Sequence, residues 1–195
     1  MVGVLEETGQ MENTIFAFTS DHGEMAGDHC MLEKRAFYEE SARVPLLLSV
    51  PWLTTEQKRV NGLSSHVDLV PTLLDLAGHE PPNLDGQSKA AEIEACDLGE
   101  GTAVMEWNGV GDRNLGNATI NLLATLPWRS IVTADRWKLN LCAGDQCELF
   151  DLNTDPYELT NLCNEPEHVD RIRLMAAQIR LWQVETGDTV SLPAT

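Results

Sequence analysis

Two apolar runs separated by a polar loop dominate the amino-terminal part of the chain. Thr14–Thr19 is apolar, β-branched and aromatic, the polar residues Ser20–Gly23 end it, and Val44–Val50 is apolar again. This pattern predicts a strand, a loop and a second strand. A near-continuous apolar run suits a strand covered on both faces, as in a parallel sheet, where ligands gather at the carboxyl ends of strands. Asp21 and His22 lie at such an end.

The middle of the chain has helix signals followed by a loop. We expect a short helix over Lys34–Ser41 and a longer one over Asp68–Ala77, with Asp68 as its N-cap and Gly78 as its stop. Residues His79–Gly101 are rich in Pro, Asn, Asp and Gly, which predicts a loop.

The carboxyl-terminal part has strand signals followed by a helix signal. Thr102–Trp107 is expected to be a strand and Gly109–Asn117 a flexible connection. Three further short apolar runs separated by turns predict an antiparallel meander: Arg129–Thr133, Trp137–Cys142 and Glu148–Leu152. Pro166–Thr186 has apolar residues on one face, which predicts an amphipathic helix that ends at Gly187.

The net charge of the chain limits the kinds of molecule that it is expected to bind. Acidic residues outnumber basic ones by 31 to 13, which gives a formal net charge of -18. Such a field repels nucleic acid and anionic membranes, so we expect neither as a partner. No apolar run is long enough to span a bilayer, and the amino terminus does not have the pattern of a signal peptide, so the chain as it stands is expected in the cytoplasm.

Five cysteines at irregular spacing match no zinc-binding pattern and no clear disulfide framework. Cys142 and Cys147 bracket a predicted turn and would be able to pair under oxidising conditions. Irregular cysteines in a chain without an export signal are usually free thiols, so the free state is the main expectation.

The loop after the first strand carries the candidate chemistry. The carboxylate of Asp21 and the imidazole of His22 are adjacent where the chain leaves the sheet, so both can reach one divalent ion. The alternative is that Asp21 caps a turn and His22 is solvated. Lys34, further along the loop, offers a cation for an anionic substrate. His66 precedes a helix start, where a packed or solvated histidine is more typical than a ligand.

Four elements in this region carry a resemblance to a known family. They are Thr19–Gly23, Gly27–His29, Lys34 and Tyr38–Pro45. The match continues, in the same order as in the family, through Val67–Gly78, Leu84–Ser88, Trp128–Leu139 and Glu148–Pro156. The chain resembles the sulfatases of the alkaline-phosphatase superfamily over nearly its whole length.

The resemblance implies an α/β fold with a truncated alkaline-phosphatase-like sheet and helices, followed by a small antiparallel meander and a C-terminal amphipathic helix. Residues 1–110 are expected to form the carboxyl-terminal part of the catalytic domain with its metal loop. Residues 111–195 are expected to form a small β subdomain with the terminal helix.

The resemblance also implies that Asp21 and His22 bind a divalent metal ion, while His29 and Lys34 steady the oxygens of a small anionic or activated ester. Family members use calcium, magnesium or manganese, but loss of upstream carboxylates would shift the preference toward zinc. Two ligands are too few for a stable site, so the others are expected from this chain or from a second copy. The candidates within the chain are Glu24, Asp28, His29 and His66.

The family's nucleophile has no counterpart in the sequence. Sulfatases carry a formylglycine, made in a Cys/Ser-x-Pro-x-Arg motif, upstream of the Asp-His element, together with two aspartates that hold the same metal. No cysteine here is followed by x-Pro-x-Arg, and Ser49–Pro51 continues with Trp52 and Leu53. Because Met1–Gly9 is similar to the end of a helix, we expect the chain to be the carboxyl-terminal part of a sulfatase-like protein.

Two functions are compatible with these observations. The first is a weak, promiscuous metal-dependent hydrolase of phosphate or sulfate esters that uses metal-bound water as its nucleophile. The second is a non-catalytic sulfatase fragment or interaction module. A truncated sheet would leave strand edges and apolar faces exposed, so a homodimer or higher homo-oligomer is expected in either case.

Overall fold

The computed structural model describes residues 2–34, 36–109 and 125–194. The chain divides into two compact units, which are described separately. Unit 1 comprises Met1–Gly23 and Arg43–Gly99, and unit 2 comprises Glu24–Ala42 and Glu100–Thr195. The expected domain division at residue 110 and most of the expected connection Gly109–Asn117 lie outside the described residues, so both stay predictions. Among the described helices, none is long and apolar enough to cross a membrane.

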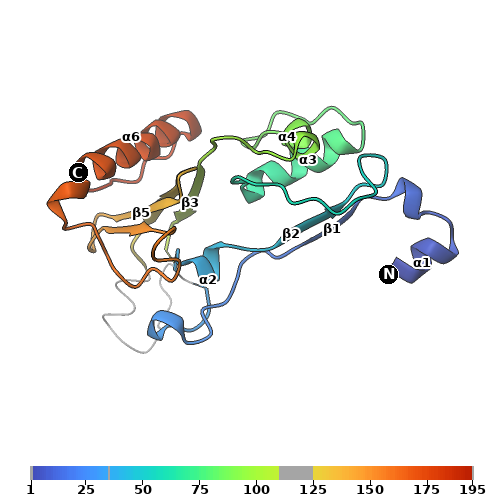
Figure 1. Cartoon of the computed structure of the whole chain (residues 1–195). Coiled ribbons are helices and arrows are strands. Elements are labelled where there is room, and N and C mark those ends of the chain that lie inside the picture. The colour runs from blue at the N-terminus through green and yellow to red at the C-terminus, as the bar shows by residue number, and fades with distance from the viewer. Residues whose placement is uncertain (1, 35, 110–124, 195) are drawn as a thin grey trace. The chain divides into compact units, whose positions relative to one another are not determined.

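Unit 1 contains a two-stranded sheet (Figure 1). Helix α1 (Val2–Glu7) and the 3-10 turn η1 (Met11–Asn13) precede β1 (Phe16–Thr19), which pairs with β2 (Leu46–Ser49). The two strands are antiparallel, so the expectation of a parallel neighbour was wrong for this pair. The physical reason is that the segment Glu24–Ala42 between the two strands belongs to unit 2. The chain then returns to unit 1, where β2 runs antiparallel to β1.

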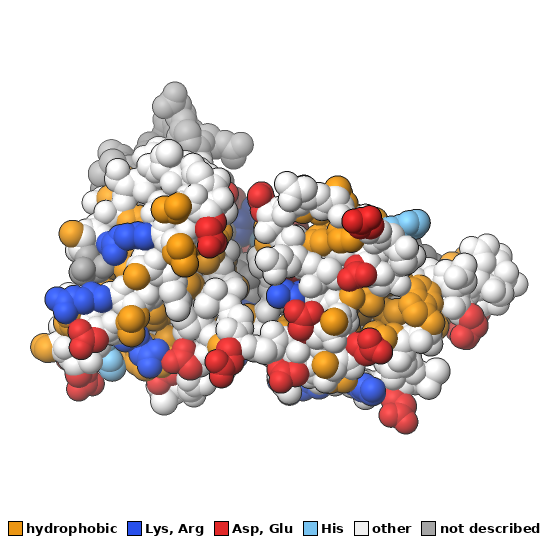
Figure 2. Space-filling model, turned by 90° about the horizontal axis from the view of Figure 1, so that it is seen from above, with side chains coloured by type: hydrophobic (Ala, Val, Ile, Leu, Met, Phe, Trp, Pro, Cys, Tyr) orange, Lys and Arg blue, Asp and Glu red, His pale blue; other side chains and the backbone are white. Residues whose placement is uncertain are grey.

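The two strands are also not covered on both faces. Phe18 and Leu47 are directly opposite each other and remain 57% and 59% exposed. An apolar run predicts that a strand is buried, but it does not show whether the segment that packs on the strand belongs to the same polypeptide chain. Hydrophobic side chains scattered among acidic ones are also exposed on the face of the molecule drawn in Figure 2, which is seen from above.

The other helices of unit 1 are η3 (His66–Asp68), α3 (Leu69–Leu76) and α4 (Ala90–Ala95). The first helical turn begins two residues earlier than expected, because Ser65 and Asp68 form a capping box in which Asp68 accepts a hydrogen bond from the Ser65 amide at 3.1 Å. A Cβ at Gly86 would lie 1.9 Å from the Val67 carbonyl oxygen, so only glycine allows this approach.

Unit 2 contains the predicted meander. Its sheet has the order β3 (Ala103–Trp107), β4 (Trp128–Val132), β5 (Trp137–Cys142) and β6 (Glu148–Asp151), and every neighbouring pair is antiparallel. The 3-10 turn η4 (Pro166–His168) leads into α6 (Val169–Thr186), which ends at Gly187 in the left-handed conformation. Helix α6 lies along the sheet (Figure 1) and contacts β4 and β5.

The core of unit 2 lies between α6 and the sheet. Helical spacing places four apolar residues of α6 on one buried face, and the sheet contributes another four: Ile172, Met175, Ala176, Ile179, Ile131, Leu139, Leu141 and Leu149. Burying one large apolar side chain of this kind contributes about 1.5–3 kcal/mol. The amphipathic pattern therefore identified the packing face of the helix.

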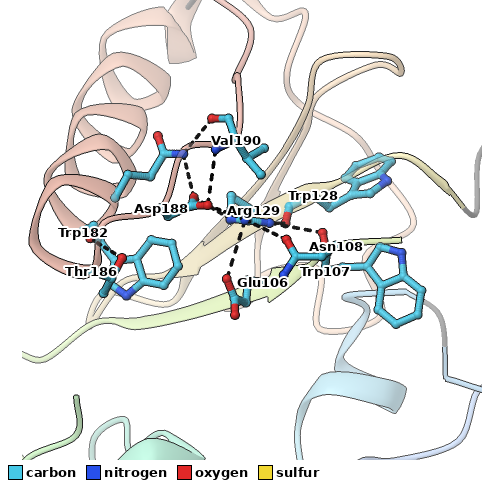
Figure 3. Close-up of polar contacts among 10 residues, drawn as sticks. Glu106, Trp107, Asn108, Trp128, Arg129, Trp182, Thr186, Asp188 and Val190 are labelled. Atoms are coloured by element: carbon cyan, nitrogen blue, oxygen red, sulfur yellow. Dashed lines mark hydrogen bonds and ion pairs between the residues drawn. The ribbon is translucent and has the colours of Figure 1, made fainter. Parts of the chain in front are cut away.

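Two buried cations reinforce unit 2. Arg129 on β4 is 1% exposed and donates five hydrogen bonds (Figure 3). Two reach the Asp188 carboxylate, and the other three reach the Trp107 carbonyl, the Trp128 carbonyl and the Asn108 side chain. A guanidinium has five N–H donors, so all of them are used and Arg129 is a structural anchor.

The second cation, Lys138 on β5, is fully buried between two carboxylates. Its Nζ lies 2.8 Å from Glu39 Oε1 and 2.9 Å from Glu158 Oε1. Glu158 also accepts a hydrogen bond from the Glu39 amide, at the start of α2 (Glu39–Ala42). Burial raises the pKa of Glu158 although Lys138 opposes that shift. These contacts fasten residues 39–42 to the sheet.

Candidate functional site

A tight polar turn directly follows β1. Ser20 Oγ donates a hydrogen bond to the His22 carbonyl at 2.7 Å, and the His22 amide donates to Asp21 Oδ1 at 3.0 Å. Both bonds are local and fix the backbone of Ser20–His22 within the turn. The turn holds the two predicted metal ligands on adjacent residues with their backbone fixed.

The hydrogen bond of the His22 ring decides which nitrogen is available. His22 Nδ1 lies 2.7 Å from the Gly23 carbonyl oxygen. A carbonyl only accepts, so Nδ1 carries the proton of the neutral ring and Nε2 presents its lone pair. That nitrogen lies 3.4 Å from Asp21 Oδ2. Two acceptor atoms that face each other at this distance suit a shared cation.

Exposure and charge also fit a metal ligand pair. The side chains of Asp21 and His22 are 84% and 35% exposed, so an ion can reach both. Slight desolvation works against a lower pKa of Asp21, but the charge of His22 in its protonated form and hydrogen bonds from the His22 amide and the Ser20 hydroxyl lower that pKa. The carboxylate is therefore ionised at neutral pH, as a metal ligand must be.

His66 supports this turn from η3. Its Nε2 lies 2.9 Å from the Ser20 carbonyl oxygen, to which it can only donate. The capping box formed by Ser65 and Asp68 fixes the backbone on both sides of His66. His66 therefore positions the turn instead of offering Nε2 to a metal. Its sequence position before a helix start did not reveal this contact.

The other two predicted site residues lie in the loop of unit 2. His29 is in the 3-10 turn η2 (Asp28–Cys30), and its backbone has a left-handed φ of 50°. Three more residues of this loop that are not glycine share a positive φ: Ala26, Cys30 and Glu33. Such conformations cost energy and cluster at functional sites, so this concentration supports a functional loop. The fully buried Met25 anchors it, and its amide bonds the Glu33 carbonyl at 2.8 Å.

The His29 ring is held by stacking. It lies parallel to the Tyr38 ring, with 3.7 Å between the centroids and 2° between the planes. Tyr38 donates a hydrogen bond to Glu148 Oε1 at 2.9 Å, and Asn140 donates to the other oxygen of Glu148. Burial and the neighbouring Glu148 carboxylate raise the pKa of Tyr38, so the hydroxyl stays protonated. The sheet thus fixes the orientation of His29 through two residues.

Sequence reasoning did not predict a role for Tyr38 or Glu148 at the functional site. Both lie in segments that carried the family resemblance, which was the available signal, but their contact spans 110 positions of sequence. Lys34 is exposed, and its carbonyl accepts a hydrogen bond from Ser41 Oγ at 2.9 Å. Its ammonium group has no hydrogen-bond or ion-pair partner among the described residues.

The structure brings Asp21 and His22 together in unit 1 and places His29 and Lys34 in one loop of unit 2. Within the described ranges, no group of three or more His, Cys, Asp or Glu side chains could hold a metal ion. The expectation that this chain completes the ligand set from Glu24, Asp28, His29 or His66 therefore finds no support there. The Asp21 and His22 pair fits a divalent ion as a partial site.

Comparisons with known proteins place this geometry in context. The family model described as Sulfatase matches residues 2–79. Arylsulfatase K of Mus musculus is 36% identical over an alignment of 170 residues that covers 83% of this chain and 29% of that protein. Choline-sulfatase of Rhizobium meliloti is 32% identical over an alignment of 196 residues that covers 96% of this chain and 35% of that protein. The chain thus spans about a third of the length of these relatives.

Solved structures share the fold. BT4656, in complex with its substrate D-glucosamine-2-N,6-O-disulfate, has a TM-score of 0.83 and 26% identity over 96% of this chain and 37% of its own. The phosphonate monoester hydrolase of Agrobacterium radiobacter has a TM-score of 0.73 and 28% identity over 94% of this chain and 37% of its own. The expected fold class, an alkaline-phosphatase-like α/β sheet followed by an antiparallel meander and helix, is confirmed.

Proposed function

Because this chain belongs to the sulfatase family of the alkaline-phosphatase superfamily, we propose that it acts in the metal-dependent hydrolysis of a sulfate or phosphate ester. The relatives include sulfatases and a phosphonate monoester hydrolase, which supports an anionic ester as the substrate. The observation that carries the proposal is the 3.4 Å approach of Asp21 Oδ2 to His22 Nε2, because two facing acceptors suit a bound cation.

Asp21 and His22 would hold the ion. The nitrogen ligand favours zinc over calcium, magnesium and manganese, which prefer oxygen. The hydrogen bond from His22 Nδ1 to the Gly23 carbonyl orients the ring and makes Nε2 a better ligand. Zinc sites use three or four protein ligands, so a second polypeptide or a second copy would complete the set.

The remaining roles fall to the loop of unit 2. When bound, a divalent ion supplies a water of lowered pKa as nucleophile and polarises the ester. Lys34 would neutralise the ester oxygens, which is needed because the chain has a net charge of -18. His29, oriented by its stack on Tyr38, would donate a hydrogen bond to the same oxygens. We expect weak, promiscuous turnover, because no formylglycine motif lies within these 195 residues.

The second candidate function is a non-catalytic sulfatase fragment or interaction module. Two observations favour it: the described residues contain no complete metal-ligand group, and the apolar pair Phe18 and Leu47 is exposed. In either case a homodimer or higher oligomer would cover that pair. A cytoplasmic location remains a prediction from the sequence.

Hydrolysis of chromogenic phosphate monoesters, diesters and triesters and of a sulfate ester tests the proposal. The protein is stripped with a chelator and then given single metals, and the metal content is measured alongside turnover. We expect metal-restored turnover, with zinc most effective, and loss of both metal and turnover in Asp21→Ala/His22→Ala.

The matched control is His79→Ala/Glu80→Ala, an exposed adjacent histidine and carboxylate in the same unit. This variant should keep metal and activity. Metal binding and turnover that survive in the Asp21/His22 variant would refute the assignment of these ligands. No turnover with any metal would favour the non-catalytic alternative.

A further inference from the structure

A pair of cysteines at one end of the meander has not been given a role above. Cys147 lies immediately before β6, and Cys163 lies in the segment that leads to α6. Both are partly buried and pack against the apolar core of unit 2. The sequence suggested Cys142 as the partner of Cys147, because only a short turn separates them. The structure instead links Cys147 to Cys163, because the Asn161 side chain hydrogen-bonds to the backbone of both cysteines.

One side chain, Asn161, fixes the backbone of both cysteines. Its Nδ2 donates to the Cys147 carbonyl at 3.0 Å, and its Oδ1 accepts from the Cys163 amide at 2.9 Å. The same oxygen accepts from the Leu149 amide, and the Leu162 amide donates to the Leu149 carbonyl at 2.9 Å. These hydrogen bonds hold the backbones of the two cysteines beside β6 through one shared side chain.

The chemistry of the thiols differs across the cluster. A hydrogen bond from Cys163 lowers the pKa of Cys147 to about 7, against the effect of burial. The same hydrogen bond and burial raise the pKa of Cys163. Burial also raises the pKa of Cys142, which is almost inaccessible. These directions favour Cys147 as the attacking thiolate and Cys163 as the protonated partner.

We propose that Cys147 and Cys163 are a thiol–disulfide site that closes in response to a low-molecular-weight disulfide such as oxidised glutathione. The Cys147 thiolate attacks one sulfur of that disulfide, forms a mixed disulfide and releases one thiolate. Cys163 loses its proton and attacks the Cys147 sulfur, which releases the second thiolate. Two protein thiols and one small disulfide become one protein disulfide and two small thiols. The product links β6 to the segment before α6.

Peptide mapping of the oxidised native chain tests this proposal. An endoproteinase that cleaves before aspartate separates the three cysteines, because Asp145 lies between Cys142 and Cys147, and Asp151 and Asp155 lie between Cys147 and Cys163. After incubation with oxidised glutathione and alkylation, we expect a cross-linked peptide that joins Cys147 to Cys163. The intact mass should fall by two hydrogen atoms, and the melting temperature should rise.

Three variants and one condition sharpen the result. Cys163→Ser should stop at the Cys147–glutathione mixed disulfide, Cys147→Ser should give no cross-link, and Cys142→Ser should cross-link like the wild type. Oxidation of the chain unfolded in guanidinium should shift the pairing toward Cys142 and Cys147, because their loop is shorter. A native cross-link between Cys142 and Cys147, or two thiols that stay free, would overturn the proposal.

Discussion

Unit 2 buries an apolar cluster of eight residues between its sheet and α6, whereas the buried described residues of unit 1 are Val50, Pro71 and Thr72. Unit 1 also leaves the cross-strand pair Phe18 and Leu47 in solvent. Apolar burial is the main favourable term in folding, so unit 2 has a core of its own, and unit 1 depends on a cover for its sheet.

The same contrast divides the predicted site. The proposed metal ligands Asp21 and His22 lie in the unit with few buried residues, and local hydrogen bonds and His66 position them. His29 lies in the well-packed unit and is oriented by Tyr38, which is tied to the sheet. Substitutions in unit 2 should therefore change stability, and substitutions in the turn of unit 1 should change ligand binding with little effect on stability.

The largest effect is expected at Lys138. Lys138→Ala leaves Glu39 and Glu158 buried without their cation, which should cost about 3–5 kcal/mol of unfolding free energy in unit 2. Urea denaturation followed by tryptophan fluorescence measures this loss. The control is Lys89→Ala, whose ion pair with Glu92 is 3.7 Å long and only partly buried. It should change stability by no more than about 0.5 kcal/mol. Equal losses in the two variants would show that the Lys138 cluster does not hold unit 2 together.

Lys138 also shows where sequence reasoning reaches its limit. The meander and α6 were predictable because the period of their apolar residues is local and the turns between them are short. Alternation along β5 would place Lys138 and Asn140 on a solvent face, but both are buried. Glu39 reaches Lys138 from 99 positions away. No local sequence pattern indicates that residues 24–42 pack on the face of β5 that carries Lys138 and Asn140.

In the candidate site too, some features were predictable from local sequence and others were not. Asp21 and His22 were identifiable because they are adjacent, follow a strand and match a family motif. The start of η3 at His66 was also readable from Ser65 and Asp68 as a capping box, although the sequence analysis chose Asp68 as the cap. The hydrogen bond from Tyr38 to Glu148 depends on tertiary packing. So do the hydrogen bonds by which Asn161 links the backbones of Cys147 and Cys163.

A smaller effect, dependent on pH, is expected at Asp188. The hydrogen bonds from Arg129 lower the pKa of Asp188 to about 2, despite its partial burial. A depressed folded-state pKa contributes stability that is present above the unfolded-state pKa of about 4 and is lost as pH falls toward about 2. Asp188→Asn should cost about 1–3 kcal/mol at pH 7 and flatten the loss of stability over that range. Urea denaturation at a series of pH values measures both.

Asp170→Asn is the control for this experiment, because Asp170 is an exposed carboxylate at the start of α6 that pairs with Arg173. It should leave the acid profile unchanged. If Asp188→Asn keeps the full acid-induced loss of stability, the Arg129 cluster is not what makes unit 2 sensitive to acid.

The smallest effect on stability is expected at the exposed pair of unit 1, where the change should appear in assembly. Phe18→Ser/Leu47→Ser removes the apolar cross-strand pair, so a self-associated wild type should dissociate in light scattering while its urea midpoint hardly changes. The control Leu174→Ser/Leu181→Ser removes two equally exposed residues from α6 in unit 2 and should leave assembly intact. A wild type that is monomeric at micromolar concentration would rule out the homo-oligomer. If the second copy also supplies metal ligands, metal content should fall together with assembly in the Phe18/Leu47 variant, because Asp21 and His22 alone are too few ligands to hold the ion.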